Sequence, residues 1–184
     1  MRKWNAIISV LVIVLLLIHA IAGGYQLLGV LPGGRTWLKA LSWCMMVLLL
    51  AHVVLGVCLT VKTLRACKKS GASYVRENKL FWARRISGFA MILFIAFHVV
   101  ILTGMKGEAY RLRPFGMLQL AGSLLLVVSV AVHILSNIKP LLIAFGAKGV
   151  GAFIRDMLFV LSVVLLFCGV AFVIYFLRWN VLWR

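Results

Sequence analysis

The stretch Arg84-Arg85-Ile-Ser-Gly-Phe-Ala-Met-Ile-Leu-Phe-Ile-Ala-Phe-His98 contains the two features that decide the fold. Two arginines open a long apolar run, and one histidine interrupts that run before it ends. The chain has four histidines, each in a different apolar run: His19, His52, His98 and His133. A histidine inside a membrane span is costly unless it has a partner, so each of the four indicates a functional site.

The composition indicates an integral membrane protein. Of the 184 residues, 65% are hydrophobic, and the mean hydropathy is +1.14. A soluble domain is about 45–50% apolar. No segment is long and polar enough for a separate soluble domain, so we expect one transmembrane domain over residues 1–184. Any chemistry in the aqueous phase would then belong to a partner protein.

Five apolar runs are long enough to cross a bilayer, which takes about 20 residues each. They lie near residues 4–24, 38–61, 84–105, 115–137 and 155–178. Pro140 follows the fourth run and is not expected to continue that helix. The fold class expected is therefore all-α, with an antiparallel four-helix bundle and one peripheral helix.

Basic residues set the expected orientation. The chain has 20 Lys and Arg but only 3 Asp and Glu. Thirteen basic residues flank one side of the five spans and seven flank the other. The excess predicts that the N-terminus is in the cytoplasm and the C-terminus is outside, in the cytoplasmic membrane of a prokaryote.

The net charge of +17 does not indicate nucleic-acid binding, because the basic residues cluster at the ends of apolar runs. The cysteines Cys44, Cys58, Cys67 and Cys168 form neither a Cys-x-x-Cys nor a Cys-x-x-Cys-His motif. This spacing argues against covalently attached haem and against a zinc or iron–sulfur site. Contact with membrane lipid is expected along every span.

The positions of the histidines along their spans predict two pairs. At about 1.5 Å per residue, His19 and His98 fall in the outer half of the membrane, and His52 and His133 fall in the inner half. In an up-down-up-down bundle, spans 1 and 3 are diagonal neighbours, as are spans 2 and 4. Each pair would therefore face across the bundle core. We expect two haem b groups with two histidine ligands each: His19 and His98 for an outer haem, His52 and His133 for an inner one.

Three other roles for the histidines compete with haem ligation. Each imidazole could simply form a hydrogen bond to a neighbouring helix. Zinc or copper would need its ligands at one level, whereas the sequence predicts two levels. Proton relays also use membrane histidines, but they normally include carboxylates, and these spans have almost none.

Residues near the histidines add candidate contacts. Small residues could leave room for a flat macrocycle: Gly56 on the face of His52, and Gly88 and Gly104 on either side of His98. Haem propionates are anionic, and arginine suits carboxylate recognition. The candidates are Arg84 and Arg85 on the inner side, and Arg35, Arg111 and Arg113 on the outer side. For any single arginine, anchoring of the helix accounts for the position equally well.

At Arg85-Ile-Ser-Gly88, leading to His98, the chain resembles the cytochrome b membrane anchors of succinate:quinone oxidoreductases and fumarate reductases. It is most similar to the single-subunit, five-helix, two-haem type, over nearly its whole length. The resemblance implies that the four histidines are axial ligands, and that Arg85 and Ser87 lie close to haem or quinone. It also implies a soluble iron–sulfur subunit and a flavoprotein at the cytoplasmic face, and a membrane quinone, often menaquinone, as electron partner. The chain itself would be a non-catalytic electron-transfer subunit.

Glu108 is the one acid expected on the outer side, which makes it the candidate for taking up quinol protons; a solvated loop charge is the simpler role. The chain lacks the embedded carboxylates proposed for proton transfer in some members of the family.

Two alternative functions remain; the first also binds two haems, and the second binds none. One is a di-haem anchor of a hydrogenase or formate dehydrogenase, and the other is a haem-free small transporter or scaffold.

Overall fold

The structure is a computed structural model that describes residues 1–71, 79–102, 115–146 and 151–182. Within these ranges the chain forms long helices and one short π-helical end, without a strand. The elements are α1 (Arg2–Leu27), α2 (Thr36–Ser70), α4 (Lys79–Leu102), α5 (Met117–Ala144), α6 (Gly151–Leu177) and η1 (Arg178–Leu182). The all-α class and the number of long helices agree with the sequence analysis.

Each of the five long helices is long and apolar enough to cross a membrane, judged by length and composition. Large apolar side chains cover their outer surfaces; Leu118 and Phe159, for example, are each 71% exposed. In water this surface would be strongly unfavourable, whereas lipid tails solvate it at no cost. The expected number of spans therefore agrees with the number of long apolar helices, although α2 ends at Ser70 rather than near residue 61 and α5 at Ala144 rather than near residue 137.

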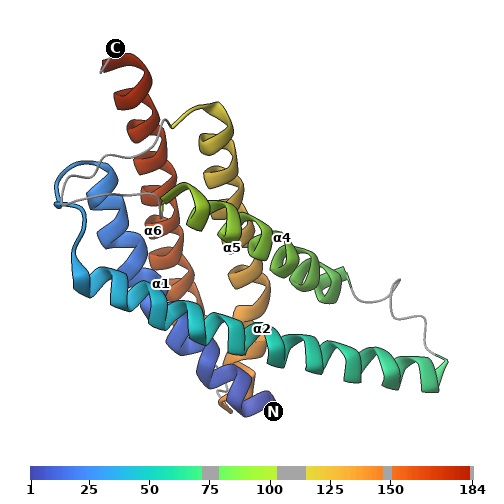
Figure 1. Cartoon of the computed structure of the whole chain (residues 1–184). Helices are drawn as coiled ribbons and strands as arrows, with labels where there is room; N and C mark the ends of the chain where they lie inside the picture. Colours follow the sequence, from blue (N-terminus) through green and yellow to red (C-terminus); the bar gives the residue numbers. More distant parts are fainter. Residues whose placement is uncertain (72–78, 103–114, 147–150, 183–184) are drawn as a thin grey trace.

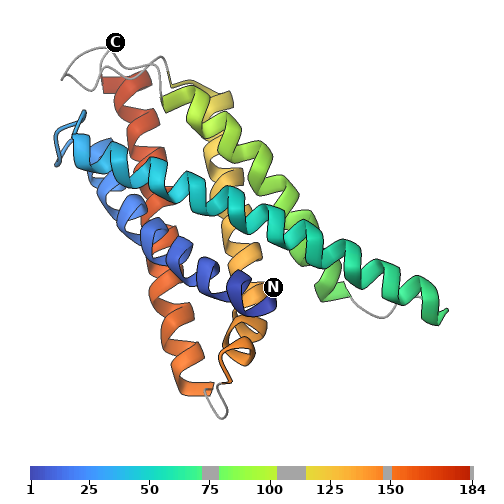
Figure 2. The same ribbon diagram turned by 60° about the horizontal axis from the view of Figure 1, so that its bottom comes forward.

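α2 is the helix that extends furthest beyond its expected span. It runs on to Ser70, with Lys68 and Lys69 in its last turn, and Gly71 ends it in the left-handed conformation with φ 69°. Glycine adopts this conformation without a steric penalty, and basic side chains stabilise the negative end of the helix dipole. Figures 1 and 2 both show this end of α2 projecting beyond the other helices.

The expectation that Pro140 ends the fourth span is wrong: α5 passes through Pro140 and continues to Ala144. Proline has no backbone N–H, so the carbonyl four residues earlier, that of Ser136, loses its usual donor. Arg84 of α4 supplies a replacement, because its Nε donates to the Ser136 carbonyl at 2.9 Å. A neighbouring helix thus satisfies the backbone group that the proline leaves free.

α6 packs against both α1 and α5 in the centre of the molecule. Its residues Ala171, Phe172 and Tyr175 form a buried cluster with Leu27 and Phe115. This position, beside α1 and α5, is compatible with the expectation that the fifth span lies outside a four-helix bundle, and that arrangement stays a prediction. The helix with the least buried surface is α2, in which Leu38 alone is buried. Figure 1 shows α6 beside α1 and α5, with α2 crossing obliquely over them.

The helix ends meet at two opposite ends of the molecule. At one end, Lys62 of α2 contacts Met1, with 3.1 Å between Nζ and Sδ; we call this the basic end. At the other end, which we call the far end, Arg178 donates to the carbonyl of Leu28, and Asn180 donates to that of Phe115 at 2.8 Å. The basic end corresponds to the side that the sequence predicts to be cytoplasmic.

Candidate functional site: two facing histidine pairs

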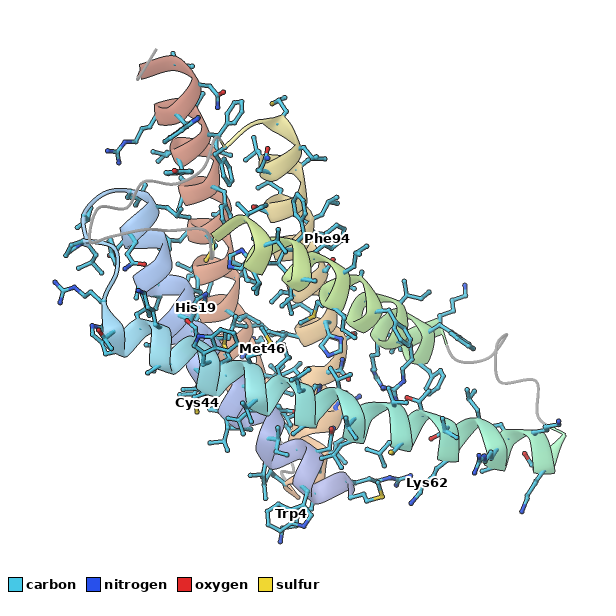
Figure 3. The ribbon with its side chains drawn as sticks, viewed as in Figure 1. Trp4, His19, Cys44, Met46, Lys62 and Phe94 are labelled. Carbon is cyan, nitrogen blue, oxygen red and sulfur yellow. The ribbon has the colours of Figure 1, made fainter. Side chains whose placement is uncertain are left out.

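The four histidines meet in two pairs. The rings of His19 on α1 and His98 on α4 have centroids 6.3 Å apart, with 74° between their planes. The rings of His52 on α2 and His133 on α5 have centroids 6.2 Å apart, with planes at 90°. These are the two pairings that the positions along the helices predict. Figure 3 labels His19 near the middle of the molecule, with Trp4 and Lys62 at the basic end.

The centroid spacing suits two imidazoles that share one metal ion. A bond from zinc, a first-row metal, to an imidazole nitrogen is about 2.0 Å long, which places two imidazoles on opposite sides of one ion with centroids about 6 Å apart. A direct edge-to-face contact between aromatic rings also allows centroids roughly 4.5–7 Å apart. The spacing therefore permits shared ligation, and the hydrogen bonds of the rings must decide between the two arrangements.

Three of the four rings bind a serine hydroxyl from the neighbouring helix. Ser42 of α2 lies 3.0 Å from Nδ1 of His19, measured from its Oγ. Ser9 of α1 lies 3.2 Å from Nδ1 of His52. In the other half of the molecule, Ser87 of α4 lies 3.3 Å from Nδ1 of His133 on α5. Each contact uses the same ring nitrogen, Nδ1.

These contacts favour Nδ1 as the ring nitrogen that has the proton. A serine hydroxyl has a single hydrogen, and each of the three serines donates it to a carbonyl of its own helix. The acceptors are the carbonyl oxygens of Asn5 at 2.7 Å, Leu38 at 2.8 Å and Arg84 at 3.2 Å. The serine oxygen can then accept from the imidazole, an arrangement that favours a proton on Nδ1 and a free lone pair on Nε2. A histidine that binds a metal through Nε2 requires this tautomer.

The fourth ring lacks such a contact. Nδ1 of His98 is buried and has no hydrogen-bond partner among the residues that the structure describes. The ring lies beside Phe172 of α6, with centroids 6.3 Å apart and planes at 89°. Phe172 is itself 6% exposed and belongs to the buried cluster with Leu27 and Phe115, so the His19–His98 pair adjoins that cluster.

The two pairs lie at different levels along the helices. On α1, Ser9 belongs to the pair nearer the basic end and His19 to the other, and ten residues separate them, or about 15 Å of helix. On α2, ten residues likewise separate Ser42 from His52. Within the described part of the chain, the helices that face across each pair, α1 with α4 and α2 with α5, are not among those packed closely together. The imidazoles therefore face each other between helices that other contacts hold in place.

The pair nearer the basic end borders a cavity of about 260 Å³. His52 and His133 line it together with the polar side chains of Arg2, Asn5 and Asn137. The remainder of its wall is mostly aliphatic. A mixed wall of this kind, apolar with a few polar groups at one end, is typical of sites for amphipathic ligands.

The arginines that the sequence singles out have separate positions. Arg84 is bound to the Ser136 carbonyl. Arg85 lies over the ring of Phe81, 5.0 Å from its centroid, and within electrostatic range of both His52 and His133. Arg35 is exposed just before the first turn of α2. The remaining predicted residues lie outside the described part of the chain: Arg111, Arg113 and Glu108.

Gly88 has a different neighbour from the one expected. The sequence predicts that it flanks His98 on its own helix, but a Cβ at Gly88 would lie 3.3 Å from Cε1 of His133 on α5. A Cβ at Gly56 would meet nothing within 4 Å among the described residues, and Gly104 lies outside them. Gly88 therefore makes room for the imidazole of His133, while Gly56 adjoins open space.

The sequence analysis missed Ser9 and Ser42 and assigned Ser87 to haem or quinone through a family resemblance. A signal for them exists in the sequence. A serine precedes His19 and His52 by ten residues each, and Ser87 precedes His98 by eleven. Eleven residues are close to three helical turns and ten are about 2.8 turns, so in each case the serine and the histidine lie within about a quarter turn of each other around the helix.

The donor set fits haem better than a bare metal ion. Among the described residues, no three His, Cys, Asp or Glu side chains gather closely enough to hold a metal ion. Two imidazoles per site are too few for the tetrahedral shell of zinc. Haem iron, in contrast, already has four porphyrin nitrogens and takes side chains only at its two axial positions.

Comparison of the chain with protein-family models, curated proteins and solved structures gives no match.

Proposed function

We propose that the chain is a di-haem cytochrome b of the cytoplasmic membrane of a prokaryote, which transfers electrons between a membrane quinone and a soluble oxidoreductase partner. The observation that supports this best is the two facing histidine pairs, in which a serine contacts Nδ1 of three rings and leaves Nε2 out of the contact. His19 and His98 would hold one haem b, and His52 and His133 the other. Bound haem supplies a one-electron redox centre at each level.

The residues around each pair perform distinct tasks in this proposal. The serines hold the imidazoles in the tautomer and orientation that ligation requires. Arg85 stabilises anionic propionate near the basic end, as its position beside His52 and His133 allows. The two levels, about 15 Å apart along α1, would divide the path across the bilayer into shorter steps. The four helices with histidines would form the haem-binding bundle, and α6 supports it from the side of α1 and α5.

The proposed partner is the iron–sulfur and flavoprotein pair of a succinate dehydrogenase or fumarate reductase, bound at the cytoplasmic face. The resemblance at Arg85–Gly88 supports this choice. The projecting end of α2, with Lys68 and Lys69, supplies positive charge on the same side for docking. Menaquinone is the quinone that the resemblance favours. The dicarboxylate chemistry would take place on the flavoprotein.

An absorption spectrum of the purified chain tests the haem proposal. We expect a dithionite-reduced b-type spectrum and two haem b per chain in a pyridine haemochromogen assay. His98→Ala should reduce this to one haem per chain, as should His133→Ala, and the double variant should retain none. A wild-type chain that folds and binds no haem would refute the proposal.

A second experiment tests the partner. The tagged chain, isolated from its native membrane in mild detergent, should bring down a flavoprotein and an iron–sulfur protein, and the complex should reduce a quinone analogue with succinate. If a hydrogenase or formate dehydrogenase subunit co-purifies instead, the haem proposal stands and the proposed partner is wrong.

A further inference from the structure

We propose that Ser123 of α5 accepts a hydrogen bond from Nδ1 of His98 and so orients the fourth imidazole as the other three serines orient theirs. This proposal deepens the proposed function, because it names the positioning residue of one presumed haem ligand. The structure contains no bond between the two residues, but three independent features of the helix pair α4 and α5 point to it.

The first feature is the reciprocal arrangement in α1 and α2. Ser9 of α1 binds His52 of α2, and Ser42 of α2 binds His19 of α1. Each helix of this antiparallel pair therefore gives a serine to the histidine of its partner. In α4 and α5, half of the same arrangement is present, since Ser87 of α4 binds His133 of α5. The reciprocal contact would join a serine of α5 to His98 of α4.

The second feature is the register of α4 against α5. Arg84 meets Ser136, and three residues further along α4, Ser87 meets His133, three residues back along α5. Phe97 is ten residues after Ser87 on α4, and Gly122 is eleven residues before His133 on α5. These two residues are in contact, because a Cβ added at Gly122 would overlap the ring of Phe97.

The antiparallel register thus holds along the whole contact. His98 and Ser123 are the chain neighbours of Phe97 and Gly122, and because the helices are antiparallel they lie about 3 Å apart in level. Ser123 also precedes His133 by ten residues, the spacing that links Ser9 to His19 and Ser42 to His52.

The third feature is the complementary state of the two polar groups. Ser123 is 3% exposed, and its Oγ donates to the carbonyl of Gln119 at 2.8 Å, which leaves the oxygen able to accept. Ser9 and Ser42 use their hydrogens in the same way. Nδ1 of His98 is buried and has no partner in the described part of the chain. A buried donor and a buried acceptor within about two residues in level would each gain from the bond.

The tautomer of His98 tests the proposal without any reference to haem. The full chain is labelled with ¹⁵N-histidine, produced in a haem-deficient host, and studied by NMR, with signals assigned from single histidine variants. We expect the proton of His98 on Nδ1 in the wild type. Ser123→Ala should move most of that proton to Nε2, and Ser123→Thr, which keeps the hydroxyl, should restore it to Nδ1.

Ser129→Ala is the matched control. Ser129 lies on the same helix, is 9% exposed and donates to the carbonyl four residues earlier, that of Leu125, at 2.7 Å. This control should leave the His98 tautomer unchanged. In the wild type, a nuclear Overhauser contact between the Nδ1 proton of His98 and the β protons of Ser123 should be visible, which needs no variant.

The outcomes separate this proposal from the haem proposal. In chains with haem, Ser123→Ala should weaken retention of the His19–His98 haem by about 10–100-fold, the usual effect of removing a partner of a metal ligand. If His98 has its proton on Nε2 in the wild type, or keeps it on Nδ1 in Ser123→Ala, Ser123 does not have this role. If the tautomer responds as expected but no haem binds, the haem proposal fails and the serine contact stands.

Discussion

A serine inside an apolar helix can use its hydrogen on its own backbone and still offer its oxygen to a neighbour. Ser9, Ser42 and Ser87 all do so, and each offers its oxygen to a histidine on the adjacent helix. The serine side chain is too short to adjust much, so the histidine ring is held in one orientation. Such an arrangement explains how an imidazole can be prepared for ligation in a region with almost no carboxylates.

The reciprocal serine contacts predict that serine variants act on the haem at their own level. Ser9→Ala should weaken the His52–His133 haem by about 10–100-fold, and Ser42→Ala should weaken the His19–His98 haem by a similar factor. Haem titration of the apoprotein, with each site isolated by removing a histidine of the other, measures both values. Ser162→Ala is the control, since Ser162 is exposed and donates only to Leu158. The scheme fails if Ser9→Ala weakens the His19–His98 haem instead.

Two glycines predict a contrast between a crowded position and an open one. Gly88→Ala places a methyl group 3.3 Å from Cε1 of His133, so the ring must move by a few tenths of an ångström. We expect His52–His133 haem binding to weaken by about tenfold, because its ligand geometry changes. Gly56→Ala, with nothing within 4 Å of the added group, should leave binding unchanged. The reduced-minus-oxidised spectrum at limiting haem compares the two, and equal effects would show that helix propensity is the cause.

At the scale of the elements, α5 shows how a helix tolerates an internal proline. Pro140 removes the donor for the Ser136 carbonyl, and the side chain of Arg84 replaces it from α4. The same contact holds the start of α4 against the end of α5, one turn from the Ser87–His133 bond. Pro140 leaves the Ser136 carbonyl free and Arg84 binds it, so the two residues together form one contact between α4 and α5, the helices that position His133.

This contact predicts that the effects of Arg84 and Pro140 substitutions on the free energy of unfolding are not additive. Arg84→Ala alone leaves the Ser136 carbonyl without a donor and should lower the free energy of unfolding by about 1–3 kcal/mol. In Pro140→Ala, the new backbone N–H can bind that carbonyl, so a second change at Arg84 should cost much less. A double-mutant cycle from unfolding in mixed micelles measures the coupling. Additive losses would mean that Arg84 acts mainly as a charge at the membrane surface.

The sequence predicts the helices and the histidine pairs well because both follow from one-dimensional quantities. Run length and hydropathy define a spanning helix, and the rise per residue gives the level of each histidine along its helix. The sequence analysis missed Ser9 and Ser42 because a hydroxyl in an apolar helix usually donates its hydrogen to a backbone carbonyl of the same helix. Nothing local in the sequence then indicates a second contact. The extension of α5 through Pro140 depends on Arg84, which is more than fifty residues away in the sequence.

At the scale of the whole molecule, α6 has no histidine, yet three of its residues belong to a buried cluster. Its contacts with α1 and α5 include Phe167 against Gly24, where a Cβ would overlap the ring, and Cys168 near the Ala20 carbonyl at 3.8 Å. Apolar packing of this kind has no sequence signature, because lipid-facing and helix-facing residues are equally apolar in a membrane protein. Charge, in contrast, distinguishes the two ends of the molecule in the sequence and predicts which of them is cytoplasmic.

The positions of the two ends predict a topology that surface labelling can measure. Cys67 lies at the basic end of α2 beside Lys68, and Gly33 lies in the turn between α1 and α2 at the far end. With thirteen basic residues on the Cys67 side and seven on the other, the positive-inside rule places Cys67 in the cytoplasm. Two chains are needed, each with one cysteine: one that keeps Cys67 alone, and one that lacks all four native cysteines and contains Gly33→Cys.

A membrane-impermeant maleimide added to intact spheroplasts should label the Gly33→Cys chain at once and the Cys67 chain only after the membrane is permeabilised. A chain with Cys44 alone, whose side chain lies on the apolar surface of α2, should resist labelling in both conditions. The reverse pattern would place the His52–His133 pair near the outer surface. The proposed soluble partner would then have to dock beside the His19–His98 pair, on the side with fewer basic residues.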